Sequence, residues 1–199
     1  MINARQNTDR FAPLTATKLR FTIEATNQLE PCLDELEVFN TDGNNIALAS
    51  AGTLVTASGS NVSLNRHELR FLNDGEYGNA RSWMSNQVGQ GWVELQFSAS
   101  QEIERVNWGR DRQGKFKDRL ATAYRIEIAA EDGVWHTVAD QTDRVPFGQR
   151  PPPLPNRNAE ETRQLADLLR EKRERNQPRP NPRPQLLFAG KFTEPIFTC

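Results

Sequence analysis

Alternating apolar and polar residues in the first two thirds of the chain predict β-strands. The clearest example is residues 18–24, where Leu19, Phe21 and Ile23 share one face. A second run covers residues 33–39. Successive side chains of a strand point to opposite faces, so this alternation is typical of a strand with one buried face.

The pattern returns later in the chain, and turn-forming residues separate the runs. Turn signals lie at residues 41–45 and 131–133, both rich in Asp, Asn and Gly. No helical pattern intervenes, which favours an antiparallel β-sandwich over alternating strands and helices. We therefore predict an all-β fold. Further strands are expected at residues 92–97, 103–108, 124–129 and 135–138. Residues 46–51 form a short apolar segment, and residues 52–65 are expected to form a long loop with one edge strand.

The stretch from residue 69 to residue 97 forms the centre of this predicted arrangement. It turns sharply at Asn73-Asp74-Gly75, continues through a polar loop to Trp83, and enters the strand that begins near Trp92. Asp side chains and loop carbonyls are the hard oxygen ligands that calcium prefers. The turn at Asp74 is therefore a candidate cation site.

Polarity and proline content mark the two ends of the predicted sandwich. Residues 1–10 are polar and are predicted to be disordered, so the sandwich is expected to cover residues 11–148. Residues 149–199 begin with a proline-rich linker, which stiffens the chain. They continue with one helix at about residues 158–176 and a terminal strand near 186–190.

Overall composition excludes several classes of function. The chain has 199 residues and a net charge of −1, which gives no global argument for binding nucleic acid. No stretch approaches the ~20 apolar residues of a membrane span. We predict no nucleic-acid partner and no membrane span.

Several of these stretches together resemble the discoidin family, the coagulation factor V/VIII type C domains, which have a galactose-binding-like jelly-roll fold. The resemblance covers about residues 11–145. The matching pieces are Lys18 to Ile23, Asp34 to Phe39, Asn45 to Ala49, Leu72 to Gly75 with Ser82-Trp83, Trp92 to Leu95, and Tyr124 to Glu127 with Asp132-Gly133 and Trp135.

The order of these pieces departs from the family. Pieces matching residues 18–39 close the domain in the usual order, whereas here they come first. This is similar to a circular permutation, as in modules of large secreted bacterial proteins. The resemblance implies an extracellular or periplasmic location within a longer chain, with neighbouring domains as partners.

The family resemblance also implies one structural calcium ion. Family members often hold it between the Asp-Gly loop and the glutamate of a Glu-x-Glu strand. That carries to the carboxylates of Asp74 and Glu35, with main-chain carbonyls near Phe71, Glu76 and Asp34. The alternative is that Asp74 only caps its turn and that Glu35 is a solvated strand residue.

The basic loop at residues 109–119 is the candidate ligand site. In sugar-binding members, loops at one end of the sandwich present arginines and an aromatic ring, because guanidinium groups bind ring hydroxyls and aromatic faces pack on sugars. The alternative, which the balanced charge of the loop favours, is that its aspartates pair with its arginines and brace the sandwich. The candidate residues are Arg110, Arg112, Phe116 and Arg119.

No catalytic pattern is recognisable. His67 and His136 lie in unrelated segments, and no metal-binding, nucleophile or phosphate-loop motif is present. The pairs Glu35/Glu37 and Glu102/Glu104 lie along single strands, whereas a glycosidase needs two carboxylates facing each other across a cleft. We therefore expect a non-catalytic module that binds a glycan or surface polymer. The alternative is a structural or protein–protein spacer without sugar affinity.

Overall fold

The fold is built on two long antiparallel strands, β1 (Asn7–Thr26) and β6 (Gly91–Gly109). The structure is a computed structural model, and it describes residues 1–145, 148–149, 160, 163–164 and 167–168. The two strands pair over nearly their whole lengths, with register shifts on either side of the segment that contains Leu14. Such irregularities bend a sheet. The pairing therefore continues around a bend instead of ending there.

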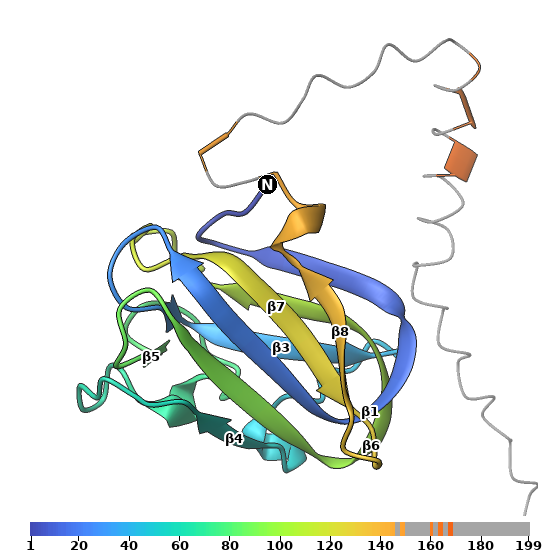
Figure 1. Ribbon diagram of the computed structural model, residues 1–199, viewed down its shortest axis with the longest axis horizontal. Helices are drawn as coiled ribbons and strands as arrows, with labels where there is room; N and C mark the ends of the chain where they lie inside the picture. The colour runs from blue at the N-terminus through green and yellow to red at the C-terminus, as the bar shows by residue number, and fades with distance from the viewer. Residues whose placement is uncertain (146–147, 150–159, 161–162, 165–166, 169–199) are drawn as a thin grey trace, which may run out of the picture. The chain divides into compact units, whose positions relative to one another are not determined.

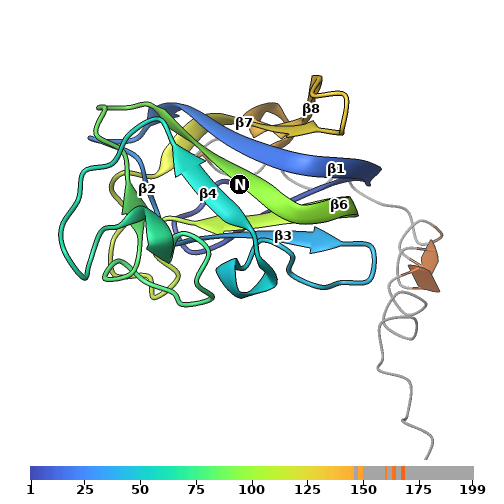
Figure 2. The same cartoon turned by 90° about the horizontal axis from the view of Figure 1, so that it is seen from below.

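The main sheet has the order β3-β6-β1-β7-β8, and β4 pairs with the first half of β6. Figures 1 and 2 show β3 lying behind β7, so the bent sheet forms two layers. The structure is thus an antiparallel β-sandwich, as the alternation predicts, and residues 1–145 contain almost no helix. The remaining strands are β2 (Cys32–Leu33), β3 (Glu35–Asn40), β4 (Leu54–Ala57), β5 (Trp83–Met84), β7 (Ala121–Ala129) and β8 (Trp135–Asp140). Strands β2 and β5 form a small second sheet. Three short 3-10 helices are η1 (Ala49–Ala51), η2 (Leu69–Phe71) and η3 (Gln141–Asp143).

The core lies between the layers and contains an aromatic cluster. Leu19, Phe21 and Ile23 of β1 are all buried, as their shared face predicts. The ring centroid of Phe21 lies 5.1 Å from that of Trp108 and 5.1 Å from that of Tyr124. These rings join β1, β6 and β7, so their contacts hold the two layers together.

Two predicted strands, at residues 92–97 and 103–108, are parts of the single strand β6. The polar residues between them stay paired with β1, with Glu102 opposite Thr15 and Gln101 opposite Ala16. Backbone hydrogen bonds do not depend on side-chain polarity, so a strand can continue where its apolar alternation stops. The apolar pattern locates buried strand segments, not strand ends.

The first ten residues differ from the expected disordered segment. β1 begins at Asn7, and Ile2 and Ala4 belong to the core. The amide of Ile2 donates to the carbonyl oxygen of Val145 at 3.1 Å. The polar residue Asp9 is buried because Trp108 and other donors satisfy its carboxylate.

Most of the predicted tail lies outside the described residues, including the proline-rich linker, most of the helix and the terminal strand. Within the expected helix, residues 160, 163–164 and 167–168 have helical backbone. The chain divides into two units, Met1–Pro151 and Pro152–Cys199. Among the described residues, no helix is long and apolar enough to cross a membrane.

Candidate functional site

Three connections meet at one end of the sandwich, and they bring the candidate residues together. Residues 27–31 follow β1, residues 86–90 precede β6 and residues 110–120 precede β7 (Figure 1). The amide of Gly89 donates to the carbonyl of Leu29 at 2.9 Å, and further hydrogen bonds join the first and third connections. We call this region the loop end.

Asp111 fixes the shape of the basic loop from inside. One of its carboxylate oxygens accepts hydrogen bonds from the amides of Lys115 at 2.8 Å and Phe116 at 2.9 Å. The other accepts from the amide of Gln113 at 3.1 Å. Asp111 is fully buried. Loop residues held by such charge-assisted bonds lose little entropy on binding a ligand, so the loop is preorganised.

The arginines of the basic loop bind partners within the protein. Arg110 is buried, and its guanidinium donates to the Asp118 carbonyl at 2.8 Å and to the Asn79 side-chain oxygen at 2.7 Å. Arg119 forms an ion pair with Glu30. Asp118 pairs with Arg110 and Arg119 in the way that the bracing alternative describes, whereas Asp111 accepts from backbone amides instead of arginines. Phe116 remains 39% exposed, with Arg110 at 5.4 Å from its ring centroid.

A cluster of buried carboxylates lies where β3 begins. The Asp34 carboxylate accepts hydrogen bonds from the amides of Arg112 at 2.5 Å and Gly78 at 3.2 Å. The Glu37 carboxylate accepts from the Arg112 guanidinium at 2.7 Å and from the Tyr77 hydroxyl at 2.9 Å. Arg112 therefore neutralises this cluster and is itself mostly buried.

Glu35 is the member of the cluster with the fewest partners. It is fully buried, so it is not a solvated strand residue. One carboxylate oxygen accepts from the Gly75 amide at 3.1 Å, and the other has no hydrogen-bond partner among the described residues. Burial, followed by the nearby charges of Asp74 and Glu37, raises the pKa of Glu35 to about 9. Burial also raises the pKa of Asp34, whose second oxygen has no hydrogen-bond partner in the described chain and lies 3.9 Å from Nε of Arg112.

The acidic turn and the start of β3 therefore meet. Gly75 contacts Glu35, and the carboxylate of Asp74 forms an ion pair with Arg81 and accepts from the amide of Glu76 at 2.8 Å. Among the predicted cation ligands, Glu35 and the turn are neighbours, and one oxygen of the Asp34 carboxylate accepts hydrogen bonds both from Gly78, in the loop that follows the turn, and from Arg112 in the basic loop. The part of the chain that the structure describes holds no group of three or more His, Cys, Asp or Glu arranged around a metal position. Phe71 is buried beside the turn, and the Glu76 side chain is exposed.

Cys32, Ser82 and His67 form a buried, hydrogen-bonded group beside the cluster. The Ser82 hydroxyl lies 2.8 Å from Nδ1 of His67 and 3.4 Å from the Cys32 sulfur, and it donates to the Asn79 carbonyl. Burial raises the pKa of the Cys32 thiol and lowers that of His67, so both groups are neutral at pH 7. His136 is exposed on β8, far along the chain from this group.

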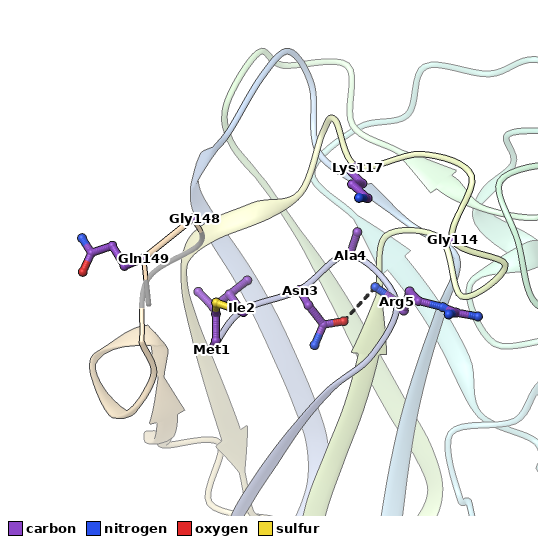
Figure 3. A pocket seen from close by; sticks show the side chains of 9 residues that line it. All are labelled: Met1, Ile2, Asn3, Ala4, Arg5, Gly114, Lys117, Gly148 and Gln149. Carbon is purple, nitrogen blue, oxygen red and sulfur yellow. Dashed lines mark hydrogen bonds between the residues drawn. The ribbon is translucent and has the colours of Figure 1, made fainter. Parts of the chain in front are cut away.

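Hollows on the sandwich include a cavity near the N-terminus and a groove at the loop end. A cavity of about 550 Å³ is lined by the first five residues together with Gly114, Lys117, Gly148 and Gln149 (Figure 3). No carboxylate and no aromatic ring lines it. A groove of about 450 Å³ lies where β1 ends and β6 begins, and its lining includes Trp92, Gln87 and Gln90. No sequence motif marks these glutamines as binding residues. The nearby glycines at 89 and 91 do indicate the loop that ends where β6 begins.

Comparisons of the chain with protein-family models, with curated proteins and with solved structures found no match. The geometry of the loop end is therefore the basis for assigning a function.

Proposed function

We propose that this domain is a non-catalytic carbohydrate-binding module with a discoidin-like, galactose-binding-like jelly-roll fold in permuted order. The observation that carries the proposal is the preorganised loop end. Buried Asp111 and Arg110 fix its basic loop. Rigid loops on a sandwich scaffold bind ligands with little ordering cost.

The positions of the carboxylates support a role without catalysis. Glu37 is bound by Arg112 and Tyr77, and Glu35 faces the turn at Gly75 from the same strand. Neither pairs with a second carboxylate across an open cleft, as glycoside hydrolysis requires. The module would act outside the cytoplasm by placing neighbouring domains of a longer chain on a glycan or surface polymer.

A glycan array tests this function directly. The full chain should bind at least one class of immobilised saccharide, and the free sugar should compete. No binding to any saccharide on a broad array, by protein shown to be folded by its circular dichroism, would reject the proposal. Release of reducing ends from a bound polysaccharide would reject the non-catalytic part.

We also propose a structural calcium ion at the acidic turn. The fit rests on the buried Glu35 oxygen that has no partner in the described structure, because a cation there would offset the cost of burying the carboxylate. Asp74 would become a ligand by exchanging its ion pair with Arg81. Main-chain carbonyls near Phe71, Glu76 and Asp34 complete the proposed set.

The calcium proposal predicts a stability change on chelation. A cation that binds only the folded state raises the melting temperature. The wild type should therefore melt at a higher temperature with Ca²⁺ than with a chelator. In Glu35→Gln, the difference between these two melting temperatures should be smaller. Equal melting temperatures with calcium and with chelator, together with no heat on titrating calcium, would remove the ion from the proposal.

A protein–protein spacer is the second candidate, and exposed apolar side chains favour it. Leu64 is 80% exposed and Val88 is 69% exposed, both in connections. Under this alternative, Leu64→Ser and Val88→Ser weaken association with domains encoded on either side of this segment, and the array stays empty. If the array shows saccharide binding that both variants retain, the spacer function is excluded as the main role.

A further inference from the structure

The groove at the junction of β1 and β6 has the chemistry of a sugar site. It measures about 450 Å³ and is lined by residues from three separate segments. Trp92 contributes a half-buried indole, and Gln87 and Gln90 contribute side-chain amides. Sugar sites combine an aromatic surface for the C–H face of the ring with a few planar hydrogen-bonding groups for the hydroxyls.

The polar groups of the groove are available to a ligand. Within the described structure, the amides of Gln87 and Gln90 and the indole N–H of Trp92 make no hydrogen bond to another side chain or to the backbone. By contrast, the arginines of the basic loop are occupied by Asp118, Asn79 and other internal partners. The groove therefore offers free side-chain amides, whereas the arginines of the basic loop are already bound.

The backbone of the groove is held firmly. The Trp92 amide donates to the Ser58 hydroxyl at 3.0 Å, and the Ser85 hydroxyl donates to the Gln90 carbonyl at 2.8 Å. A Cβ atom at Gly91 would lie 2.7 Å from the Ser85 hydroxyl oxygen, so only glycine lets these hydroxyls approach the strand. This packing fixes the backbone from which Gln90 and Trp92 project before a ligand arrives.

The charge of the groove selects the class of sugar. No lysine or arginine lines it, and its one carboxylate, Glu24, is paired with Arg125. The Arg20 guanidinium, which lies over the Trp92 ring, is likewise paired, with Glu94, so these groups offer no unpaired cation to an acidic glycan, whereas neutral hydroxyls can donate to the carboxylate oxygens. Neutral saccharides are therefore favoured over sulfated or sialylated ones.

We propose that this groove is the saccharide site and that it binds a neutral sugar, with Trp92 as the stacking surface and Gln87 and Gln90 as hydroxyl partners. This inference rests on the proposed function, since it assigns the residues and the ligand class of a carbohydrate-binding module. It moves the site from the basic loop to the connection before β6 in the same loop end.

Binding measurements on matched variants of the full chain test the assignment. The array-positive oligosaccharide is titrated by calorimetry into the wild type, Trp92→Ala, Gln87→Ala, Trp135→Ala and Phe116→Ala. Trp135 is the matched control, because its ring also packs on Arg20 but does not line the groove. Cζ of Arg20 lies 4.4 Å from the ring centroid of Trp135 and 5.1 Å from that of Trp92. Gln87 is exposed, so its removal leaves the fold intact.

We expect Trp92→Ala to weaken binding by about tenfold or more, the loss of one aromatic packing surface. Gln87→Ala should weaken it about threefold to tenfold, the loss of one hydrogen-bonding group. Trp135→Ala and Phe116→Ala should bind like the wild type.

The possible failures are distinguishable. Wild-type protein that binds no saccharide rejects the proposed function itself. Saccharide binding that Trp92→Ala and Gln87→Ala both retain, with loss in Phe116→Ala, leaves the function and rejects the groove. Selective binding of acidic glycans rejects the neutral ligand class. If extended peptides displace the sugar and free monosaccharides do not, the groove is a peptide site and the sugar site is rejected.

Discussion

At the scale of single residues, Glu35 shows how burial changes the chemistry of a side chain. The carboxylate is fully buried with one hydrogen bond, from the Gly75 amide. Its ordinary pKa of 4.5 rises to about 9, so the folded protein without a cation holds a proton there at neutral pH. A bound cation would replace that proton, which links the two states of the site.

This shift predicts a pH-dependent stability in chelator. Below pH 4.5 both the folded and the unfolded states hold the proton on Glu35, and between pH 4.5 and about 9 only the folded state does. The contribution of Glu35 to the free energy of unfolding therefore falls as the pH rises through this range. The slope from one such group is about 1.4 kcal/mol per pH unit at most. Glu35→Gln has no proton to release and should lose this slope.

Urea unfolding across this pH range measures the effect, with the exposed Glu76→Gln as control. We expect the control to follow the wild type. A constant difference in the free energy of unfolding between the wild type and Glu35→Gln at all pH values would show that Glu35 titrates normally.

At the scale of elements, buried polar clasps connect strands that are far apart in sequence. Asp9 of β1 accepts hydrogen bonds from the Trp108 indole at 2.9 Å and the Tyr124 hydroxyl at 2.8 Å, and it is ion-paired with Arg144 at 2.6 Å. One carboxylate thus joins β1, β6, β7 and the segment after η3. The sequence did not predict this clasp, because nothing local marks which polar residue will find distant partners.

Removing the clasp should destabilise the whole sandwich. Asp9→Ala leaves the Arg144 charge and the buried Trp108 and Tyr124 donors without their acceptor, which costs about 3–5 kcal/mol. Asp42→Ala, in an exposed turn, is the control and should cost less than about 0.5 kcal/mol. Chemical unfolding measures both, and equal stabilities of the two variants would contradict the role of Asp9.

The basic loop gives a second prediction for an element. Asp111→Ala removes the acceptor for the amides of Lys115 and Phe116, so hydrogen exchange at these amides should quicken by about tenfold or more. Exchange in the centre of β7 should not change. Nuclear magnetic resonance measures both, and unchanged protection at Lys115 would show that the loop is held by other contacts.

At the scale of the whole molecule, the core that stabilises the sandwich lies between Ile2 and Ala139. The chain divides after Pro151, and the core residues all belong to the first unit. The sandwich should therefore fold without the rest of the chain.

A fragment ending at Pro151 tests this independence. Its melting temperature should lie within about 2 °C of that of the full chain, the shift that ~1 kcal/mol or less would give in a domain of this size. Scanning calorimetry of both chains gives the comparison. A fall of roughly 10 °C or more would show that residues beyond Pro151 stabilise the sandwich.

The sequence by itself determined the strands with a buried face, such as residues 18–24, and from them the all-β antiparallel class. It also located the turn at Asp74 and a strand carrying Glu35, because alternation and turn chemistry are local properties of the chain. Only the tertiary structure decided that β6 is one bent strand, that the first ten residues join the core, and that the arginines of the basic loop are occupied. It also placed Gln87 beside Trp92. These features depend on which distant segments close over a residue, and that burial fixes the partners, the pKa and the exposure of each side chain.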